Sequence, residues 1–447
     1  MPDRLRTHPQ RPSWQGRNAT LLDRLFALET FGIKLGLDNI SGLCAALGHP
    51  ERTFTSIHVA GTNGKGSVTA MVHAALVAAG LRAARFTSPH LVELSERFVI
   101  GTEPVTQEAL QLAAGDVLDC ADRLRATGEL PVHPTFFEAT TAVAFELFRR
   151  AKVDIAVIEV GMGGRYDSTN VVPSPIGAIT SIGFDHQQYL GQTLEAIAFE
   201  KAGIIKRDME VVVGTLPPQA RKVVAAVATK QGAHLIDADR DTLAIAHDDE
   251  QLTFETPEDR YGPLPLGLRG EHQIANALVA IRLLESARRH GVRVPQAAIE
   301  RGLTEVQWPG RLELLQVQSG GTLLLDAAHN IDGARALAAY LRVRHPERPT
   351  LVIGAMRDKD IDAIIGALLP VVSNVVATAA ATPRALPANE LAARIKAASP
   401  TVDVQAEPNP ETAVEQALSG GHTVCVAGSI FVVGAVRDRF KHRAILR

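Results

Sequence analysis

Short apolar runs alternate with helical patterns along the whole chain. The clearest run, residues 153–160, is apolar at nearly every position, as is typical of a parallel strand covered on both faces. Other strands are predicted over 56–60, 83–86, 177–181 and 210–213, and helices over 21–28, 68–79, 137–150 and 274–290. Strands that alternate with helices in this way predict an α/β protein with mainly parallel sheets.

The alternation starts afresh after Trp308-Pro309-Gly310. Strands are predicted over 322–325, 350–353, 375–378, 402–406 and 423–427, with helices over 333–343, 361–369, 388–398 and 410–418. This order is typical of a doubly wound unit. We therefore expect a loose N-terminal arm over 1–15, a P-loop-type domain with a mainly parallel sheet over 16–308, and a smaller Rossmann-like α/β domain over 309–447. A short β-hairpin is expected within 246–270.

Composition excludes several classes of protein. The 447 residues are too many for one ordinary core, and a formal net charge of −3 argues against a general nucleic-acid binder. The three cysteines lie far apart, which fits a reducing cytosol and gives no zinc or disulfide pattern. No apolar run has the length of a membrane span, and the first residues lack the apolar centre of a signal peptide. We expect a cytoplasmic protein that binds neither membrane nor nucleic acid.

The segment Gly61-Thr62-Asn63-Gly64-Lys65-Gly66-Ser67 stands between a predicted strand and a predicted helix. Glycines let backbone N–H groups turn inward, and the helix N-terminus adds positive potential, so this loop suits the phosphates of ATP. Lys65 would neutralise phosphate charge, and a hydroxyl of the loop would reach Mg²⁺. The usual P-loop pattern has a glycine where Val59 stands and a serine or threonine where Gly66 stands. A Gly-rich turn with a surface lysine is the alternative interpretation.

Polar side chains follow other predicted strands. Ser88 follows 83–86, Glu159 lies near the end of 153–160, His186 follows 177–181, and Lys201 opens the next segment. Ligands of open α/β sheets collect outside the carboxyl ends of strands, and Mg²⁺ prefers oxygen ligands. Each residue alone is explained as well by a turn, a salt bridge or a structural histidine. Their convergence beside the glycine-rich loop favours a magnesium site.

These motifs resemble the Mur-ligase superfamily, and in particular its folylpolyglutamate synthase and dihydrofolate synthase family. The runs that carry the resemblance are the loop itself, Thr87-Ser88-Pro89-His90, Glu159-Val160-Gly161-Met162-Gly163-Gly164-Arg165, Asp185-His186 and Glu200-Lys201-Ala202-Gly203. The resemblance implies that Ser88, Glu159 and His186 bind magnesium. It also implies that Lys201 is carbamylated and acts in catalysis with Lys65 and His186. An ordinary ion pair is the alternative for Lys201.

The same resemblance assigns a folate pocket and further ATP contacts. The residues expected to contact the folate or pterin are Ile33, Lys34, Leu35, Thr135, Phe137, Tyr166, Asp167 and Ser168. Tyr166 and Ser168 depart mildly from the family pattern, which bears on substrate preference. Beyond the loop, the residues expected to contact ATP are Asn276, Arg311, Asp326 and His329. We expect ATP in a cleft between the two domains, with Lys65 on one side and Asn276, Arg311 and Asp326 on the other.

The resemblance implies an ATP-dependent ligase that joins L-glutamate to dihydropteroate or to a reduced folate. The folate carboxylate would attack the γ-phosphate of ATP, and the glutamate amine would then displace phosphate from the acyl phosphate. Two alternatives stay open. A Mur-type ligase for a UDP-sugar peptide needs an additional domain, but only 60 residues precede the loop. A P-loop nucleotide switch would leave Glu159, His186 and Lys201 without a role. We expect ATP and Mg²⁺ as cofactors and a monomeric protein.

Overall fold

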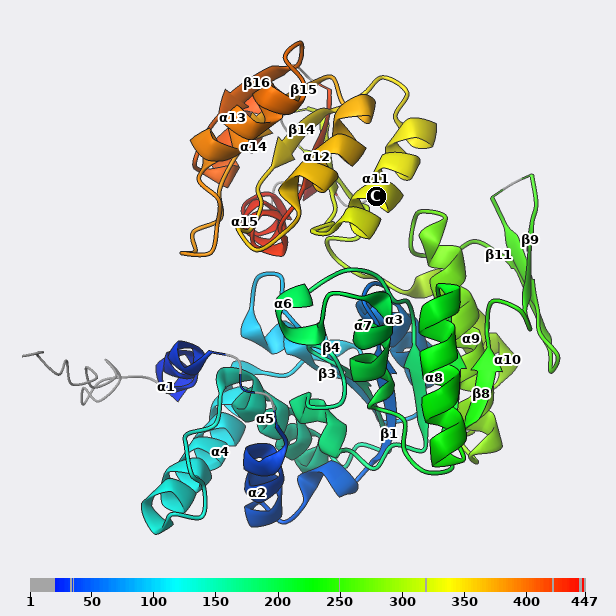
Figure 1. Ribbon diagram of the computed structural model, residues 1–447. Coiled ribbons are helices and arrows are strands. Elements are labelled where there is room, and N and C mark those ends of the chain that lie inside the picture. The colour runs from blue at the N-terminus through cyan, green and yellow to red at the C-terminus, as the bar shows by residue number, and fades with distance from the viewer. Residues whose placement is uncertain are drawn as a thin grey trace, which may run out of the picture.

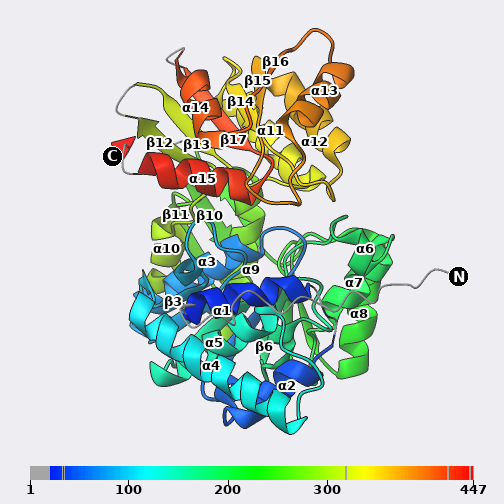
Figure 2. The ribbon, with the colours of Figure 1, turned by 90° about the vertical axis from the view of Figure 1, so that its left-hand side faces the viewer.

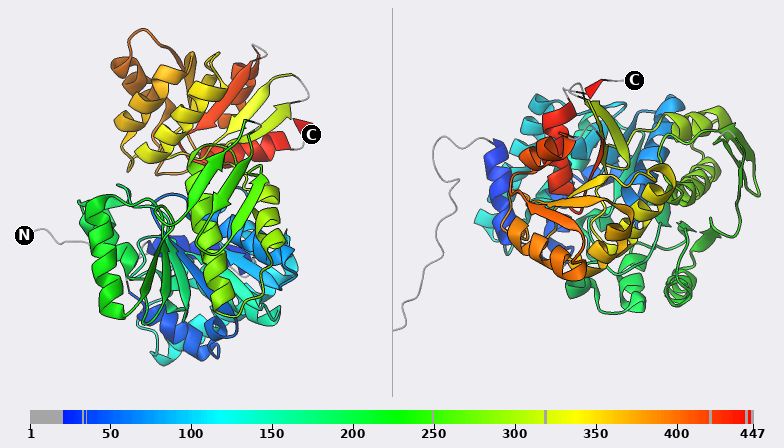
Figure 3. Two further views of the ribbon diagram at one scale, coloured as in Figure 1. Left: turned by 90° about the vertical axis from the view of Figure 1, so that its right-hand side faces the viewer. Right: turned by 90° about the horizontal axis from the view of Figure 1, so that it is seen from above.

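The computed structural model describes residues 21–32, 34, 36–248, 250–317, 320–419, 422–441 and 444–445. The expected arm over 1–15 lies outside these residues. Within them the strands form sheets of eight, three and seven strands. The seven-stranded body, yellow to red, is stacked on the eight-stranded one (Figure 1 and Figure 3). The two large sheets confirm the predicted α/β fold, whereas the domain boundary at 308/309 stays a prediction.

The eight-stranded sheet has the order β4-β3-β2-β5-β1-β6-β7-β8. Its pairs are parallel except β2–β3 and β3–β4. Apolar residues fill β1 and β5 because helices cover both faces of the sheet. The strands are β1 (Thr55–Ala60), β2 (Ala83–Phe86), β3 (Phe98–Ile100), β4 (Glu103–Pro104), β5 (Ile155–Glu159), β6 (Ile176–Ile179), β7 (Glu210–Val213) and β8 (His234–Asp237).

Three groups of helices cover this sheet. Helices α3 (Lys65–Ala78), α9 (His272–Arg289) and α10 (Gln296–Glu305) share one core cluster with Ile57 and Val59 of β1. Helices α1 (Leu21–Ala27), α2 (Asp38–Ala46), α4 (Gln107–Thr127) and α5 (Phe136–Arg150) pack on the other face, which Figure 2 shows from outside. Helices α7 (Leu194–Ala202) and α8 (Pro218–Gln231) cover β7, and the short α6 (Gln187–Leu190) precedes α7.

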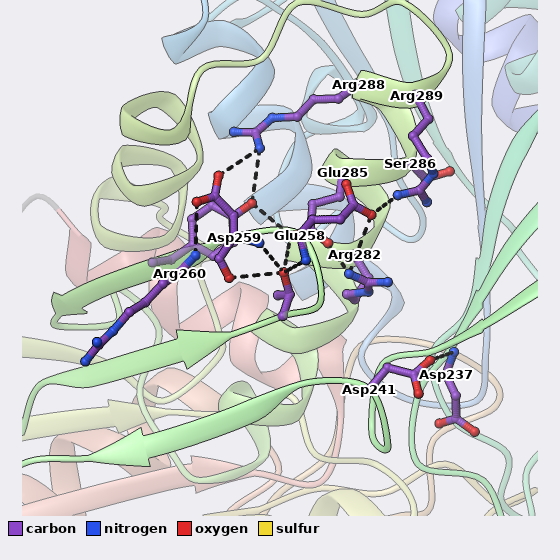
Figure 4. Close-up of polar contacts among 12 residues, drawn as sticks. Asp237, Asp241, Glu258, Asp259, Arg260, Arg282, Glu285, Ser286, Arg288 and Arg289 are labelled. Carbon is purple, nitrogen blue, oxygen red and sulfur yellow. Dashed lines mark hydrogen bonds and ion pairs between the residues drawn. The ribbon is translucent and has the colours of Figure 1, made fainter.

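The expected hairpin is part of a three-stranded antiparallel sheet, β9 (Leu243–Ala246), β10 (Leu252–Glu255) and β11 (Arg260–Leu264). A buried polar network, drawn in Figure 4, fixes the β10–β11 turn to α9. The Glu285 carboxylate accepts hydrogen bonds from Thr256 Oγ1 at 2.6 Å and Tyr261 Oη at 2.9 Å, and it pairs with Arg282. This network anchors the C-terminal half of α9, whose first turn reaches the glycine-rich loop.

The seven-stranded sheet has the order β16-β15-β14-β17-β13-β12-β18, in which β12 runs antiparallel to both of its neighbours, β13 and β18. Helices on both faces make it the predicted doubly wound unit. Its strands are β12 (Glu313–Val317), β13 (Thr322–Leu325), β14 (Thr350–Ile353), β15 (Asn374–Ala377), β16 (Asp403–Ala406), β17 (Thr423–Ala427) and β18 (Ala444–Ile445). Its helices are α11 (Ile331–Arg344), α12 (Ile361–Leu368), α13 (Ala388–Ala398), α14 (Pro410–Leu418) and α15 (Ile430–Phe440).

No helix in the described part of the chain is long and apolar enough to cross a membrane.

Candidate active site

The glycine-rich loop connects the end of β1 to the start of α3. Gly61 has φ +154° and Gly64 has φ +83°, both in the region that favours glycine. A Cβ on Gly61 would lie 1.9 Å from Thr180 Oγ1, so the loop needs glycine there for space as well. Lys65 Nζ donates to the carbonyls of Gly61 at 3.1 Å and Thr62 at 3.2 Å. The Lys65 side chain therefore folds back over the loop, where it would neutralise the charge of a phosphate.

The predicted magnesium ligands lie at the end of β5 or shortly after the ends of β2 and β6. Glu159 ends β5 and is 5% exposed, and its Oε2 accepts a hydrogen bond from the Ser88 backbone N–H at 3.1 Å. Burial raises the pKa of Glu159, although the positive charge of Lys65 opposes the shift. His186 has φ +50° at the start of α6, and burial lowers its pKa to about 4, so its imidazole is neutral at pH 7.

These groups fit a divalent cation by the chemistry of their donors. A buried carboxylate and a neutral imidazole each present a lone pair, and phosphate oxygens and waters usually complete the shell of Mg²⁺. The described residues contain no group of three or more His, Cys, Asp and Glu side chains that could hold a metal without such outside ligands. A cation here would take its remaining ligands from phosphate oxygens and water.

Lys201 reaches the same loop from a different helix. It closes α7 and does not open a new segment, because the apolar pattern of 194–202 is itself helical. The side chain is buried, and its Nζ donates to the carbonyl of Gly61 at 2.8 Å. Burial, and then the positive charge of Lys65, lower the pKa of Lys201 to about 7. A large fraction of this amine is thus uncharged at neutral pH, which is the form that adds CO₂.

The predicted folate residues on α5 have structural partners in the chain. Thr135 caps α5: its Oγ1 accepts from the Glu138 N–H at 3.2 Å, while Glu138 Oε2 accepts from the Thr135 N–H at 2.7 Å. The Phe137 ring lies 6.0 Å from that of Phe86. A Cβ on Gly161 would be 2.4 Å from Phe137, so this ring packs against the glycine-rich segment that follows β5.

The segment 166–168 combines one exposed and two buried residues. Tyr166 is 41% exposed, and the Arg165 guanidinium lies 4.4 Å from its ring centroid. Asp167 is buried, and its carboxylate accepts the backbone N–H groups of Thr169 at 3.0 Å and Met162 at 2.8 Å. Ser168 is buried beside it. Asp167 therefore shapes the loop. Lys34 is exposed, and the predicted contacts at Ile33 and Leu35 lie outside the described residues.

Asn276 lies on the same side of the nucleotide loop as Lys65. It belongs to the first turns of α9, and α9 packs on α3 in one core. A Cβ on Gly64 would be 2.3 Å from Asn276 Oδ1, and the neighbouring Gln273 donates to Ser67 Oγ at 3.3 Å. The expectation that Asn276 faces Lys65 across a cleft is therefore wrong. Helix α9 follows β11 in sequence, but its apolar face packs against β1 and α3, and this packing carries Asn276 to the loop.

Arg311, Asp326 and His329 come from the seven-stranded body. Asp326 accepts the backbone N–H groups of Leu312 and Ala328, both at 2.9 Å, and so holds two loops together. His329 Nδ1 lies 2.9 Å from the carbonyl of Ala327, and its Nε2 lies 3.6 Å from Asp185 Oδ2. Burial shifts the pKa of Glu159 and of His272 most, and the positive charge of Arg311 is a further cause that lowers both values.

Three polar residues outside the predicted set join the two bodies at this site. Asn330 donates to Asn63 Oδ1 at 2.9 Å and to Asp185 Oδ2 at 3.2 Å, and Lys359 pairs with Asp185. Asp185 stands within the Asp185-His186 motif, whereas Lys359 follows β14. Their pairing carries no sequence signal, because 174 positions separate them.

Comparisons with known proteins show which family has this architecture. Residues 59–284 match the model of the Mur ligase middle domain, and residues 310–430 match that of the Mur ligase glutamate ligase domain. A dihydrofolate synthase/folylpolyglutamate synthase of Bacillus subtilis is 34% identical over 92% of this chain and 96% of its own length.

Solved structures give the same result. A Mycobacterium tuberculosis folylpolyglutamate synthase complexed with ADP and AMPPCP has a TM-score of 0.87 and 34% identity, covering 95% of this chain and 99% of that one. A bifunctional folylpolyglutamate synthase/dihydrofolate synthase with Mn, AMPPNP and L-glutamate bound has a TM-score of 0.81 and 31% identity, covering 94% and 98%.

Proposed function

Because the chain belongs to the folylpolyglutamate synthase and dihydrofolate synthase family of Mur ligases, we propose that it joins L-glutamate to dihydropteroate, to a reduced folate, or to both. It is an ATP-dependent ligase. These comparisons favour neither a Mur-type ligase for a UDP-sugar peptide nor a P-loop nucleotide switch. The observation that carries the proposal is that Lys201 and, from the other body, Asn330 both hydrogen-bond to the glycine-rich loop, over which Lys65 folds back.

The reaction needs a carboxylate to become an electrophile. Its oxygen attacks the γ-phosphorus of ATP, ADP leaves, and an acyl phosphate forms. The glutamate amine then attacks the acyl carbon and phosphate leaves, so that an amide, ADP and phosphate are the products. Lys65 and Arg311 would neutralise the phosphate charge that shifts during the first step. The interface between the two bodies would exclude water, which hydrolyses acyl phosphates.

Other residues would bind the cation, the pterin ring and the rest of the nucleotide. A divalent cation, when bound, supplies charge neutralisation of the phosphates, and Ser88, Glu159 and His186 would be its protein ligands. A carbamate on Lys201 would add an anionic oxygen donor beside Gly61. Phe137 and Tyr166 would border the pterin ring, with Thr135, Asp167 and Ser168 shaping the pocket, and Asn276, Asp326 and His329 would line the nucleotide side.

The discriminating experiment identifies products by mass. The protein is incubated with ATP, Mg²⁺ and L-glutamate plus either dihydropteroate or tetrahydrofolate. A product heavier by one glutamyl unit is expected with at least one substrate, together with an equal amount of ADP. Formation of neither product in a folded, ATP-binding preparation contradicts the proposal.

We further propose a cytoplasmic monomer with domains over 16–308 and 309–447. Its three cysteines are buried and free, as suits a reducing compartment. Light scattering after size exclusion tests the monomer, since a dimer would show twice the mass of the chain.

A further inference from the structure

The segment that joins the two bodies is anchored on α3 before it reaches the nucleotide site. Helix α10 approaches α3 so closely that a Cβ on Gly302 would be 2.5 Å from Ala75 Cβ. Val306, just past α10, is buried. The chain therefore arrives at Trp308 from a position fixed by the same helix that begins at Lys65.

Trp308 lies directly on the first turn of α3. A Cβ on Gly66 would be 2.8 Å from Trp308 Cζ2 and 3.0 Å from its Nε1, so the indole occupies the space that any larger residue would need. The Arg85 guanidinium of β2 lies 5.0 Å from the centroid of the same indole. Arg85 makes no ion pair in the described part of the chain, and its Nε is buried without a hydrogen-bond partner. The indole covers this guanidinium, and the negative charge of Glu159 also favours its charged form.

The residues after Trp308 are held from the other body. Pro309 restricts the backbone, and Gly310 has φ +71° and is buried. The Gly310 N–H donates to Glu313 Oε2 at 2.8 Å, and its carbonyl accepts from the Ala327 N–H at 2.8 Å. Arg311 follows immediately, and the next residue, Leu312, donates its N–H to Asp326. The backbone of Arg311 is therefore fixed on both sides.

We propose that Trp308 is a positioning residue that sets Arg311 against the phosphates of ATP by seating the linker between Gly66 and Arg85. The proposal rests on the proposed function, in which Arg311 contacts the nucleotide. Loss of the indole removes the contact between the linker and the phosphate loop but leaves the Arg311 side chain itself unchanged. The guanidinium then samples a wider range of positions, and ATP binding and phosphoryl transfer weaken together.

A double-mutant cycle separates positioning from ordinary packing. The variants are Trp308→Ala, Arg311→Ala and the two combined, with kcat and the KM for ATP measured for each. We expect Trp308→Ala to raise the KM for ATP about tenfold. The combined variant should be no worse than Arg311→Ala alone, because the tryptophan acts through the arginine. Trp308→Phe should recover most of the affinity, since a ring still covers Gly66.

Two further variants keep the test decisive if Trp308→Ala fails to fold. Arg85→Met retains an apolar stem but removes the charge on the indole, and it should raise the KM for ATP about threefold. Leu243→Ala, an exposed apolar change on β9, is the matched control and should leave the KM unchanged. Additive losses in the cycle, or a lower melting temperature with an unchanged KM for Arg85→Met, overturn the role of Trp308. An Arg311→Ala variant with normal kinetics overturns the nucleotide contact itself, and with it the proposed function of Arg311.

Discussion

The Nζ atom of Lys359 lies 2.6 Å from Oδ1 of Asp185, and both side chains are only 9% exposed. Lys359 follows β14 in the seven-stranded sheet, and Asp185 follows β6 in the eight-stranded one. Burial alone would raise the pKa of Asp185, but His329, His186 and Lys359 together hold it well below its usual range. This charged pair therefore joins the two bodies directly beside the predicted magnesium ligand His186.

Replacement of Asp185 by asparagine should loosen the two bodies. It leaves the buried Lys359 ammonium without a counter-charge, and breaking such a pair costs about 3 kcal/mol or more. We expect a lower melting temperature and a larger radius of gyration by small-angle scattering without substrates. The double variant Asp185→Asn/Lys359→Met should recover part of the stability, because no charge is then left unpaired. A single variant as compact and as stable as wild type would show that the pair does not hold the bodies together.

Replacement of Lys65 by alanine should lower kcat by about 100-fold or more, because the loop loses the charge aimed at the phosphates. The fold should persist, since within the described residues Lys65 Nζ hydrogen-bonds to two backbone carbonyls, those of Gly61 and Thr62. Steady-state kinetics and thermal unfolding are measured on the same preparation. Lys222→Ala on α8 is the control for loss of a lysine elsewhere. Near wild-type turnover in the Lys65 variant would remove its phosphate role.

The elements that sequence predicted best are the buried parallel strands. Strands β13, β14 and β17 have the bounds predicted for them, because continuous apolar runs are typical of strands covered on both faces. Helix α3 begins three residues before the predicted 68, since the polar first turn, Lys65-Gly66-Ser67, faces the site and shows no apolar period. The short antiparallel strands β3, β4 and β12 were not predicted, because they lie outside the run of buried parallel strands.

Only those residues of the candidate site that stand in short contiguous motifs could be predicted from the sequence. Ser88, Glu159, His186 and Lys201 each stand in a short run that can be recognised alone. The side of the cleft on which Asn276 lies depends on how α9 packs, and the contact of Asn63 with Asn330 joins positions 267 residues apart. Such relationships are set by tertiary packing, and a single sequence carries no periodic signal for them.

Glu159→Gln and His186→Ala should each raise the Mg²⁺ concentration for half-maximal activity by about tenfold or more. The glutamine keeps the size of the side chain and removes the charge that attracts the cation. Activity is titrated with Mg²⁺ at fixed ATP, with Glu195→Gln on α7 as a control carboxylate. An unchanged Mg²⁺ requirement in both variants would exclude the two residues as ligands.

Glu285→Ala should destabilise the protein by about 3 kcal/mol. It removes the nearer carboxylate from the buried Arg282 guanidinium, which keeps only Glu258 at 3.7 Å, and it removes the acceptor of Thr256 and Tyr261. Glu285 and Arg282, labelled in Figure 4, belong to the C-terminal half of α9, whereas Asn276 belongs to its first turns. The KM for ATP should therefore change much less than the midpoint of urea unfolding. Glu305→Ala, which removes an exposed ion pair with Arg301, should change the midpoint little. Equal effects of the two substitutions would contradict the anchoring role of Glu285.

Lys201→Met should separate activity from stability. The variant should lose most ligase activity, since it has no amine to form a carbamate. The buried wild-type lysine has a pKa of about 7, lower than in the unfolded chain, so the unfolded chain binds more protons between that value and about 10.5. The destabilising effect of the buried amine is thus fully present below pH 7 and is lost as the pH rises toward 10. We expect Lys201→Met to be more stable than wild type at pH 6.5, with the difference shrinking by pH 9, measured by urea unfolding. Bicarbonate should raise wild-type activity after CO₂ depletion and leave the variant inactive. A variant that keeps its activity, or a wild type that is indifferent to bicarbonate and carries no added mass on Lys201, would reduce this residue to a hydrogen-bond donor for Gly61.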